Sequence, residues 1–388
     1  MSAEVHQPGD PGASGTVPLA VPTIGDLERR YVLEALESGF VSSVGPFVTE
    51  FEKRFAEHVG SRHAVACATG TAAIHVALRI VGVEAGDDVA CSDFTFVGSA
   101  NPITYLGATP VLVDSELVSW NLDPRLLRDE LERRAARGEA LPRAVEVVHI
   151  LGQPADVAPL LELCAEYGIP LVEDAAESLG ARWTAGPLAG RHTGTVGTVG
   201  CFSFNGNKIA TTGGGGMIVT DDDALAARAR HLTTQAKVAD AAYLHDEVGY
   251  NYRLTNLAAA LGLAQLEQLD DFVAAKRRIG DVYDRAFVDL PLTVHAGPPE
   301  TASSRWLYSV LLDEADRDDL LAHLAAAGVG ARALWRPLHL QPPFADAPRL
   351  GGEVADDLFR RGISLPCSVR LTDQDQTRVI EALRGYFT

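Results

Sequence analysis

The chain has 388 residues, with 33 Lys and Arg against 52 Asp and Glu, and therefore a net charge of −19. This charge repels nucleic acid and anionic lipid surfaces, so neither is expected as a partner, and an anionic ligand must be held by local donors. The five cysteines form no CxxC pair, so the sequence predicts neither a disulfide framework nor a metal site and favours the reducing cytoplasm. No apolar run reaches the roughly 20 residues of a membrane span, and no signal peptide is expected.

Three parts are expected along the chain. Residues 1–16 are rich in Pro, Gly and Ser and are expected to form a disordered lead. Residues 17–269 are expected to form a large domain, in which Phe47, Phe51 and Phe55 make an apolar stripe on a helix over 47–59. Residues 270–388 are expected to form a smaller C-terminal α+β domain that starts with a long helix.

Short apolar runs alternate with helix-length segments in the first half of the large domain. The runs lie at 64–68, 88–93, 109–114, 143–150 and 169–174, with helices expected at 71–80 and 156–167. This alternation predicts an α/β fold of βαβ units with a mostly parallel sheet. Ligands bind such sheets beyond the carboxyl ends of the strands, so functional residues are expected just after these runs.

Two adjacent acids, Glu173 and Asp174, end one of the predicted strands. A carboxylate at this position can pair with a protonated ring nitrogen, as in the sites that hold pyridoxal phosphate. The alternative is that the acid caps the following helix, because Asp is among the best N-cap residues. The local sequence leaves both possibilities open.

Lys208 lies between a strand-like run and the glycine tract at 213–216. A lysine in a confined setting can lose its proton and act as an amine nucleophile that forms a Schiff base. The phosphate-loop pattern GxxxxGK[ST] is absent, because Gly206 stands two residues before the lysine and Ile209 follows it. A lysine exposed in a solvated loop is the alternative.

Two further positions suit a flat, phosphorylated ligand. The turn at 68–73 contains Gly70 and Thr71 at the start of an expected helix, where free backbone N–H groups can bind a phosphate, and Ser203 can add a hydroxyl. Phe96 follows another strand and can stack on a ring, although core packing is the usual role of Phe. Together with Lys208 and Asp174, these positions meet four requirements of pyridoxal phosphate: amine, ring-nitrogen carboxylate, phosphate cradle and stacking aromatic.

Six stretches, in this order over nearly the whole chain, resemble the DegT/DnrJ/EryC1/StrS family of sugar aminotransferases. They are ATGTAAIHVAL, FTFVGSANPITYLGATPVLVD, HILGQPADV, VEDAAESLG, FSFNGNK and GYNYRLTNLAAALGLAQLEQL. Within the family, VSSVGPFVTEFE and HDEVGYNYRLTN are most similar to the legionaminic acid and bacillosamine branch, which acts on UDP-4-keto-6-deoxy-hexosamines.

The resemblance implies a pyridoxal phosphate enzyme of fold type I, usually a homodimer with shared active sites. It assigns the cofactor-bonding lysine to Lys208, the ring-nitrogen partner to Asp174 and a position near the ring to Glu177. It places Phe96 on the ring and Gly70, Thr71 and Ser203 at the phosphate, with Asn251 reaching the phosphate from the partner subunit. Arg253 is a possible anion contact in this comparison, and Ser42, Ser43 and His339 match stretches that border the nucleotide sugar.

The chain departs from the family pattern at Leu151, where an aromatic residue is usual, and in its fuller glycine tract. We expect the first change to alter a wall of the sugar pocket. The residues around Trp335, Arg336 and His339 are expected to line that pocket.

The activity implied is a ping-pong transfer of an amino group from L-glutamate to the 4-keto carbon of a nucleotide-linked 4-keto-6-deoxy sugar. The alternatives are an aminotransferase of another keto sugar or cyclitol, a lysine-bearing dehydratase, and a regulatory member without catalysis. The sequence does not specify the nucleotide, the substituent at the sugar 2-position or the configuration of the new amine.

Overall fold

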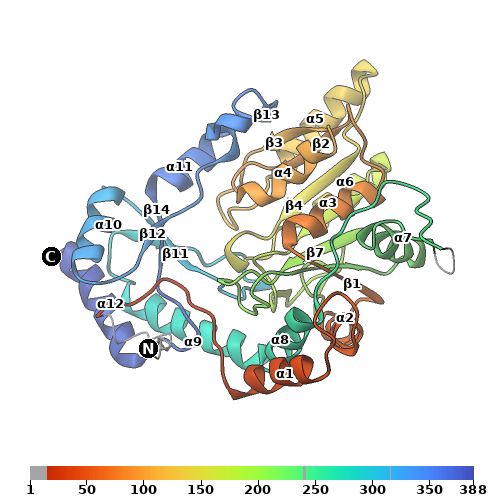
Figure 1. The fold of residues 1–388 in the computed structure, drawn as a ribbon. Helices are drawn as coiled ribbons and strands as arrows, with labels where there is room; N and C mark the ends of the chain where they lie inside the picture. Colours follow the sequence, from red (N-terminus) through yellow and green to blue (C-terminus); the bar gives the residue numbers. More distant parts are fainter. Residues whose placement is uncertain (1–14, 239–241, 315) are drawn as a thin grey trace.

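The computed structural model describes residues 15–238, 242–314 and 316–388, so residues 1–14 of the lead expected at 1–16 lie outside the described residues. Its centre is an eight-stranded sheet in the order β1-β8-β7-β5-β4-β2-β3-β13 (Figure 1). The strands are β1 (His63–Cys67), β2 (Asp88–Ser92), β3 (Thr109–Val113), β4 (Ala144–Val148), β5 (Leu171–Asp174), β7 (Val199–Ser203), β8 (Gly216–Thr220) and β13 (Arg349–Leu350). Only β8 runs antiparallel to its neighbours, β1 and β7. The predicted α/β fold with a mostly parallel sheet is confirmed.

Helices cover both faces of this sheet. One face packs against α3 (Gly70–Ile80), α4 (Val97–Tyr105) and α7 (Asp223–Thr233). The other face packs against α5 (Pro124–Arg137) and α6 (Ala158–Tyr167) on one half, and against α2 (Pro46–Val59) and α8 (Asn256–Glu267) on the other half. The helix α1 (Asp26–Glu37) lies on α8 (Figure 1). The sheet is therefore a buried central layer, as expected for parallel strands.

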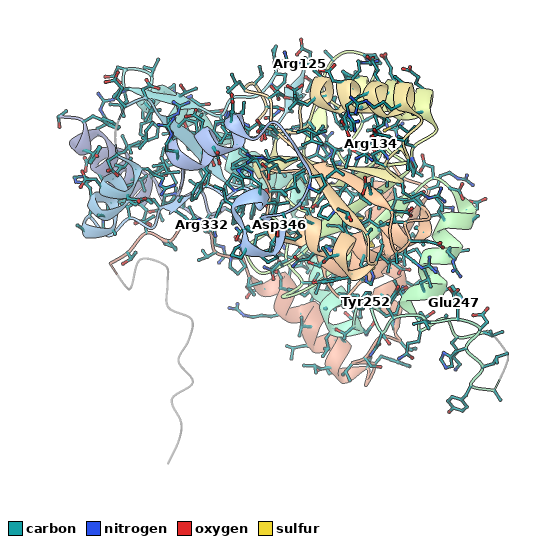
Figure 2. All side chains as sticks on the ribbon, turned by 90° about the horizontal axis from the view of Figure 1, so that it is seen from above. Arg125, Arg134, Glu247, Tyr252, Arg332 and Asp346 are labelled. Atoms are coloured by element: carbon teal, nitrogen blue, oxygen red, sulfur yellow. The ribbon has the colours of Figure 1, made fainter. Side chains whose placement is uncertain are left out.

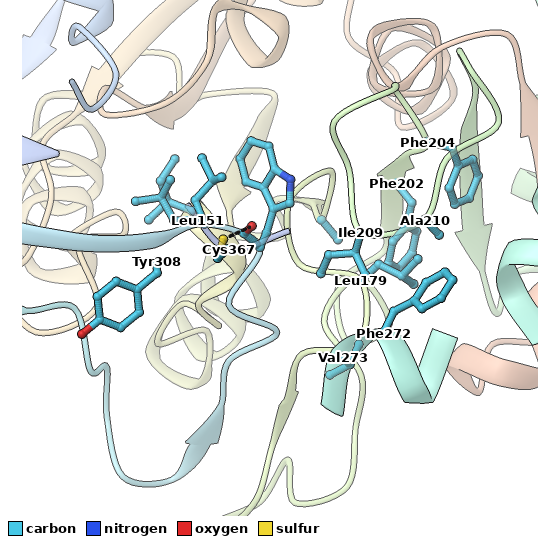
Figure 3. Close-up of a cluster of buried hydrophobic side chains, with 14 of the residues drawn as sticks. Leu151, Leu179, Phe202, Phe204, Ile209, Ala210, Phe272, Val273, Tyr308 and Cys367 are labelled. Atoms are coloured by element: carbon cyan, nitrogen blue, oxygen red, sulfur yellow. Dashed lines mark hydrogen bonds between the residues drawn. The ribbon is translucent and has the colours of Figure 1, made fainter. Parts of the chain in front are cut away.

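The phenylalanine stripe of α2 is part of the core, as its helical spacing predicted. Phe51 and Phe55 are buried, and the ring of Phe55 lies 5.0 Å from that of Phe202 and 5.4 Å from that of Phe204. Phe47 is partly buried against the same cluster. Figure 3 shows the neighbouring part of this core, where Phe272 and Val273 lie beside Phe202, Ile209 and Ala210. The segment that carries Lys208 is thus anchored by apolar packing on both sides of the lysine.

The last third of the chain forms a second sheet with its own helices. The antiparallel sheet has the order β12-β14-β11-β9, with β9 (Leu292–Val294), β11 (Tyr308–Leu312), β12 (Arg332–Ala333) and β14 (Gly362–Leu365). The helices are α9 (Leu269–Ala286), α10 (Arg317–Ala326), α11 (Glu353–Arg361) and α12 (Asp373–Tyr386). Figure 1 shows these elements beside the central sheet, in colours that run from teal at α9 to blue at α12.

Two strand pairings connect the last third to the first part of the chain. β13 extends the central sheet by pairing with β3, and β10 (Thr301–Ala302) pairs with β6 (Arg182–Trp183). Short 3-10 turns are η2 (Ile150–Gly152), η3 (Leu338–Leu340) and η4 (Pro342–Phe344). The predicted domain boundary between residues 269 and 270 stays a prediction. None of the helices in the described ranges is both long and apolar enough to span a bilayer.

Candidate active site

A cavity of about 320 Å³ opens at the carboxyl edge of the central sheet. Its walls are the residues that follow β1, β2, β5 and β7, together with Trp306, Arg332 and Trp335 from the last third of the chain. The volume lies at the lower end of the range of about 300–1,000 Å³ that is typical of small-molecule sites. The cavity therefore lies where an α/β sheet is expected to bind its ligand.

Lys208 reaches this cavity from the turn after β7, and its side chain is only 13% exposed. The Nζ atom lies 3.7 Å from Oε1 of Glu177 and 3.9 Å from the centre of the Trp306 ring. Burial lowers the pKa of Lys208, while the negative charges of Glu177 and Asp174 oppose this shift. The amine therefore loses its proton more readily than a solvated lysine, as a nucleophile or general base requires.

The two adjacent acids at the end of β5 point to opposite sides of the sheet. Asp174 lines the cavity, where its Oδ2 accepts a hydrogen bond of 2.8 Å from Ser99 Oγ and its Oδ1 accepts one of 3.0 Å from the Ala176 amide. Burial raises the pKa of Asp174, and these two hydrogen bonds with the charge of Lys208 oppose the shift. A positively charged partner in the cavity would complete the stabilisation of its ionised form.

On the other side of the sheet, both carboxylate oxygens of Glu173 accept hydrogen bonds from protein groups. Its carboxylate accepts hydrogen bonds from His149 Nε2 at 2.9 Å and from the amides of Gly194, Val196 and Gly197 at 2.6–2.8 Å. Although burial alone raises the pKa of Glu173, the hydrogen bond and charge of His149 and the amide bonds bring it below the usual value. Glu173 therefore has a structural role, which leaves Asp174 as the acid that faces a ligand.

The phosphate-binding turn predicted after β1 lies on the same cavity. Thr69 caps α3 by accepting a hydrogen bond of 3.0 Å from the Ala72 amide, and Gly70, Thr71 and Ser203 line the wall. A Cβ atom on Gly70 would lie only 2.7 Å from Cβ of Ser203. This glycine therefore allows the positive end of α3 to approach the end of β7, which places free N–H groups and two hydroxyls together for an anion.

Three aromatic rings border the cavity. Phe96 is 52% exposed, although it is a large apolar side chain, and its ring lies 5.3 Å from that of Trp335. Trp306 is buried and donates a hydrogen bond of 2.7 Å from Nε1 to the Asn207 carbonyl. Phe96 therefore presents an exposed ring to the cavity, and its stacking on a ligand ring stays a prediction.

Glu177 is buried at the wall, where its Oε2 accepts a hydrogen bond of 2.8 Å from the Leu151 amide. Burial raises the pKa of Glu177, and the charge of Lys208 opposes the shift. Leu151 has a positive φ of 56° and packs in the core instead of lining the cavity. The expectation that Leu151 alters a wall of the pocket therefore has no support in this geometry, since the residue acts on the site only through its amide.

Besides Leu151 and Arg336, five of the predicted residues are not on the walls of this cavity. Arg253 donates a hydrogen bond of 2.6 Å to Glu52 and is 14% exposed, so its charge is already paired. His339 lies between Asp93, at 2.5 Å from Nδ1, and Asp356, at 3.2 Å from Nε2. The remaining three, Ser42, Ser43 and Asn251, lie on partly or fully exposed segments. The contact of Ser42 and Ser43 with the nucleotide sugar and the contact of Asn251 with the phosphate of the partner subunit stay predictions.

Several wall residues were absent from the sequence predictions. Ser99 is one turn into α4, and Trp306 and Arg332 come from the last third of the chain, where no motif singled them out. Arg332 is labelled among the C-terminal elements in Figure 2. Its guanidinium lies 4.5 Å from the centre of the Trp335 ring, and no carboxylate of the described residues is within ion-pair distance. Trp335 is on the wall as expected, whereas Arg336 is not.

These walls fit pyridoxal phosphate by the chemistry of their groups. The helix N-terminus with Gly70, Thr71 and Ser203 suits the phosphate, and the Asp174 carboxylate, with two donors already bound, suits a protonated ring nitrogen. The Lys208 amine suits an aldehyde, and the exposed face of Phe96 suits the ring.

The chain is similar to known proteins over nearly its full length. A family model described as the DegT/DnrJ/EryC1/StrS aminotransferase family matches residues 22–384. EpsN of Bacillus subtilis (strain 168), which carries the name of a pyridoxal phosphate-dependent aminotransferase, is 44% identical over 376 residues, or 95% of each chain. GDP-perosamine synthase of Caulobacter vibrioides is 41% identical over 95% of this chain and 97% of that protein. The crystal structure of a DegT DnrJ EryC1 StrS aminotransferase from Brucella abortus superimposes with a TM-score of 0.87 at 30% identity, covering 93% of this chain and 95% of that chain.

Proposed function

Because the chain belongs to the DegT/DnrJ/EryC1/StrS family of pyridoxal phosphate-dependent sugar aminotransferases, we propose that it transfers an amino group from L-glutamate to the 4-keto carbon of a nucleotide-linked 4-keto-6-deoxy sugar. The observation that carries this proposal is that Lys208 and Asp174 lie on the walls of one cavity, where burial shifts the pKa of each toward its neutral form. Charged partners would be needed to hold either group ionised.

Bound pyridoxal phosphate supplies an aldehyde that condenses with amines and a ring that accepts an electron pair. Gly70, Thr71 and Ser203 would hold its phosphate at the N-terminus of α3, and Asp174 would accept a hydrogen bond from its protonated ring nitrogen. Lys208 Nζ would take a proton from the α-carbon of the amino donor and pass it to the cofactor, and in the second half of the cycle it would take a proton back from the cofactor and deliver it to the sugar C4. One mobile amine serves both halves, which suits a ping-pong order in which donor and acceptor use the same site in turn.

Arg332 gives the cavity a second positive group besides Lys208. With the overall charge at −19, an anionic substrate needs such a local cation to bind. We infer that Arg332 binds the carboxylate of the amino donor, because its guanidinium lies on the wall and forms no ion pair with a carboxylate of the described residues. Replacing Arg332 with Gln should raise KM for glutamate more than KM for the sugar.

The nucleotide of the acceptor has two candidates. The motifs favour a UDP-linked 2-acetamido sugar, as in the legionaminic acid and bacillosamine branch. The identity of 41% to a protein named GDP-perosamine synthase favours a GDP-linked sugar instead, and we place this candidate first. Assay of UDP-, GDP- and dTDP-linked 4-keto-6-deoxy sugars, with kcat/KM as the measure, decides between them.

The proposal is tested at Lys208. Borohydride reduction of the purified holoenzyme should fix the cofactor on the peptide that contains Lys208, and glutamate should release 2-oxoglutarate in stoichiometric amount. Lys208→Ala should lose turnover by at least about 10³-fold, because nucleophile and base are one group. Lys53→Ala is the matched control, since Lys53 is an exposed lysine on α2, and it should retain wild-type rates.

Other results would favour other functions. Near-normal transamination by Lys208→Ala would refute the assignment. Dehydration of the sugar without consumption of glutamate would indicate a dehydratase, and failure of the wild type to bind the cofactor would indicate a regulatory member. A fully active monomer in solution would contradict the homodimer that we propose from the family resemblance.

A further inference from the structure

Thr95, which follows β2, is a buried threonine on the wall of the cavity to which the function proposed above gives no role. The residue is 3% exposed, and its Oγ1 atom lies 2.9 Å from Oγ of Ser99, which is 2% exposed. Ser99 in turn forms the hydrogen bond of 2.8 Å with Oδ2 of Asp174. Three buried side chains therefore form one continuous chain of hydrogen bonds that ends on the acid of the site.

The direction of this chain follows from the chemistry of its groups. A serine hydroxyl has a single hydrogen, and an ionised carboxylate can only accept a hydrogen bond. Ser99 must therefore give its hydrogen to Asp174, and the lone pairs of Ser99 Oγ remain free to accept. Thr95 is then the donor in the contact of 2.9 Å between the two hydroxyl groups. The Thr95 hydroxyl donates to Ser99, and the Ser99 hydroxyl donates to Asp174.

The start of α4 fixes the positions of the two hydroxyl groups. Thr95 and Ser99 are four residues apart at the first turn of this helix, where the Ser99 amide donates a hydrogen bond of 3.1 Å to the Phe96 carbonyl. The Thr95 amide donates one of 3.2 Å to the Asp93 carbonyl. From this turn, Ser99 reaches over β4, the strand between β2 and β5, to the carboxylate of Asp174. The backbone therefore holds both hydroxyl groups in place for the acid.

Such a chain has its largest effect in a buried site of low dielectric constant. Hydrogen bonds in series polarise one another, so donation by Thr95 makes Ser99 a stronger donor. A hydrogen bond to a charged acceptor is also stronger than one between neutral groups. Burial raises the pKa of Asp174, and the hydrogen bond from Ser99 is among the contacts that oppose this shift. Loss of either hydroxyl group therefore disfavours the ionised form of Asp174.

We propose that Thr95 is a positioning residue that acts through Ser99: this relay of two hydroxyl groups keeps the Asp174 carboxylate ionised and fixed in place for the ring nitrogen of the cofactor. The inference rests on the proposed function, because that function assigns the ring nitrogen to Asp174. The competing explanation is that the Thr95 hydroxyl only stabilises the start of α4.

The test removes one hydroxyl group at a time. Thr95→Val keeps the branched shape without the donor, Thr95→Ser keeps the donor, and Ser99→Ala removes the link to the acid. Thr220→Val is the matched control, because Thr220 is also buried and its hydroxyl donates a hydrogen bond of 2.9 Å to the Thr198 carbonyl. Thr220 ends β8, which runs antiparallel, so it lies at the opposite edge of the sheet from the cavity.

Cofactor affinity reports the role at the ring nitrogen. Each apoenzyme is titrated with pyridoxal phosphate and with its deaza analogue, in which a C–H group replaces that nitrogen. The dissociation constant of pyridoxal phosphate should rise by about tenfold in Ser99→Ala, because a hydrogen bond to a charged group is lost. It should rise by about threefold in Thr95→Val, through the weaker polarisation of Ser99, and stay at the wild-type value in Thr95→Ser and Thr220→Val.

The deaza analogue separates the two explanations for Thr95. Its affinity should be the same in all of these proteins, because it offers no nitrogen to the acid. An equal loss of affinity for both compounds in Thr95→Val would show that the hydroxyl only supports the structure of the wall. That result, or a Thr95→Val protein that binds pyridoxal phosphate like the wild type, would overturn the proposal.

A double-mutant cycle tests whether Thr95 acts through Ser99. In the Ser99→Ala background no hydroxyl is left to polarise, so Thr95→Val should cause no further loss of affinity for pyridoxal phosphate. Losses that add in the double variant would place Thr95 outside the relay and would contradict the proposal. A wild type that binds pyridoxal phosphate but aminates none of the keto sugars would refute the proposed function instead, and the comparison of the two compounds would still report on the relay.

Discussion

Asp174 has accepted two hydrogen bonds and still faces the cavity, so its carboxylate is prepared for one further donor. An amide at this position cannot stabilise a charged ring nitrogen. Asp174→Asn should therefore lower kcat by about 10²–10³-fold, the range seen when one electrostatic stabiliser is removed. Cofactor retention should change little, because the phosphate contacts are untouched, and single-turnover rates with glutamate measure the effect.

The neighbouring acid supplies the control for this prediction. Glu173→Gln weakens the carboxylate that binds His149 and the amides of Gly194, Val196 and Gly197, so it should lower the melting temperature. Its side chain lies on the opposite face from the cavity, and the intrinsic rate should stay near the wild-type value. A normal rate in Asp174→Asn with a large loss in Glu173→Gln would reverse the two assignments.

Glu177 controls the proton affinity of Lys208 through a separation of 3.7 Å between Oε1 and Nζ. Burial lowers the pKa of Lys208 and the Glu177 charge opposes this, so neutralising the carboxylate lets the pKa fall further. The amine acts as a base only when unprotonated. Glu177→Gln should therefore move the acid limb of the kcat profile to lower pH, by about one to three units. An unchanged acid limb would mean that another group titrates there.

At this scale the sequence was informative only where a residue stood in a local motif. All of the residues so predicted stand at or just after a strand end, and all of them line the cavity: Gly70, Thr71, Phe96, Asp174, Ser203 and Lys208. The strand pattern alone did not separate the adjacent Glu173 and Asp174, because the choice depends on which face of the sheet each one meets; the family resemblance assigned the role to Asp174. Arg253 and His339 were placed near the substrate by resemblance, but their partners Glu52, Asp93 and Asp356 come from distant segments.

At the level of elements, the N-terminus of α3 is held close to the end of β7 by a glycine. Gly70→Ala would place a Cβ atom 2.7 Å from Cβ of Ser203, so the helix must move and the phosphate site must open. The dissociation constant of the cofactor should rise by about tenfold or more, as measured by fluorescence titration of the apoenzyme. Gly206→Ala is the control, because its added Cβ meets nothing within 4 Å, and it should bind like the wild type.

Most elements of the central sheet follow from periodicity, and several others do not. The strands β1 to β5 and the helices α2, α3 and α6 lie within a few residues of the predicted segments. The antiparallel direction of β8 and the two-residue strands β6, β10 and β13 could not be foreseen, because each is defined by a partner far away in the chain. Their segments carry too few residues to show an alternating pattern.

For the whole molecule, the site exists only when the two parts of the chain pack together. Trp306, nearly a hundred residues after Lys208, covers the lysine with its ring and binds the Asn207 carbonyl. Arg332 comes from β12 of the second sheet. Sequence motifs alone could predict the cavity walls that the central sheet provides. The walls that the last third of the chain provides depend on tertiary packing and could not be predicted in this way.

The net charge of −19 acts on every anionic substrate that approaches. Raising the salt concentration from about 0.01 M to about 0.1 M shortens the Debye length from roughly 30 Å to 10 Å and screens this repulsion. Groups in contact inside the buried cavity are screened much less, so kcat should stay constant while KM for the nucleotide sugar falls. Steady-state kinetics at several salt concentrations measure both quantities. A KM that rises with salt would mean that positive groups near the cavity, with Arg332 as the first to test, outweigh the charge of the molecule as a whole.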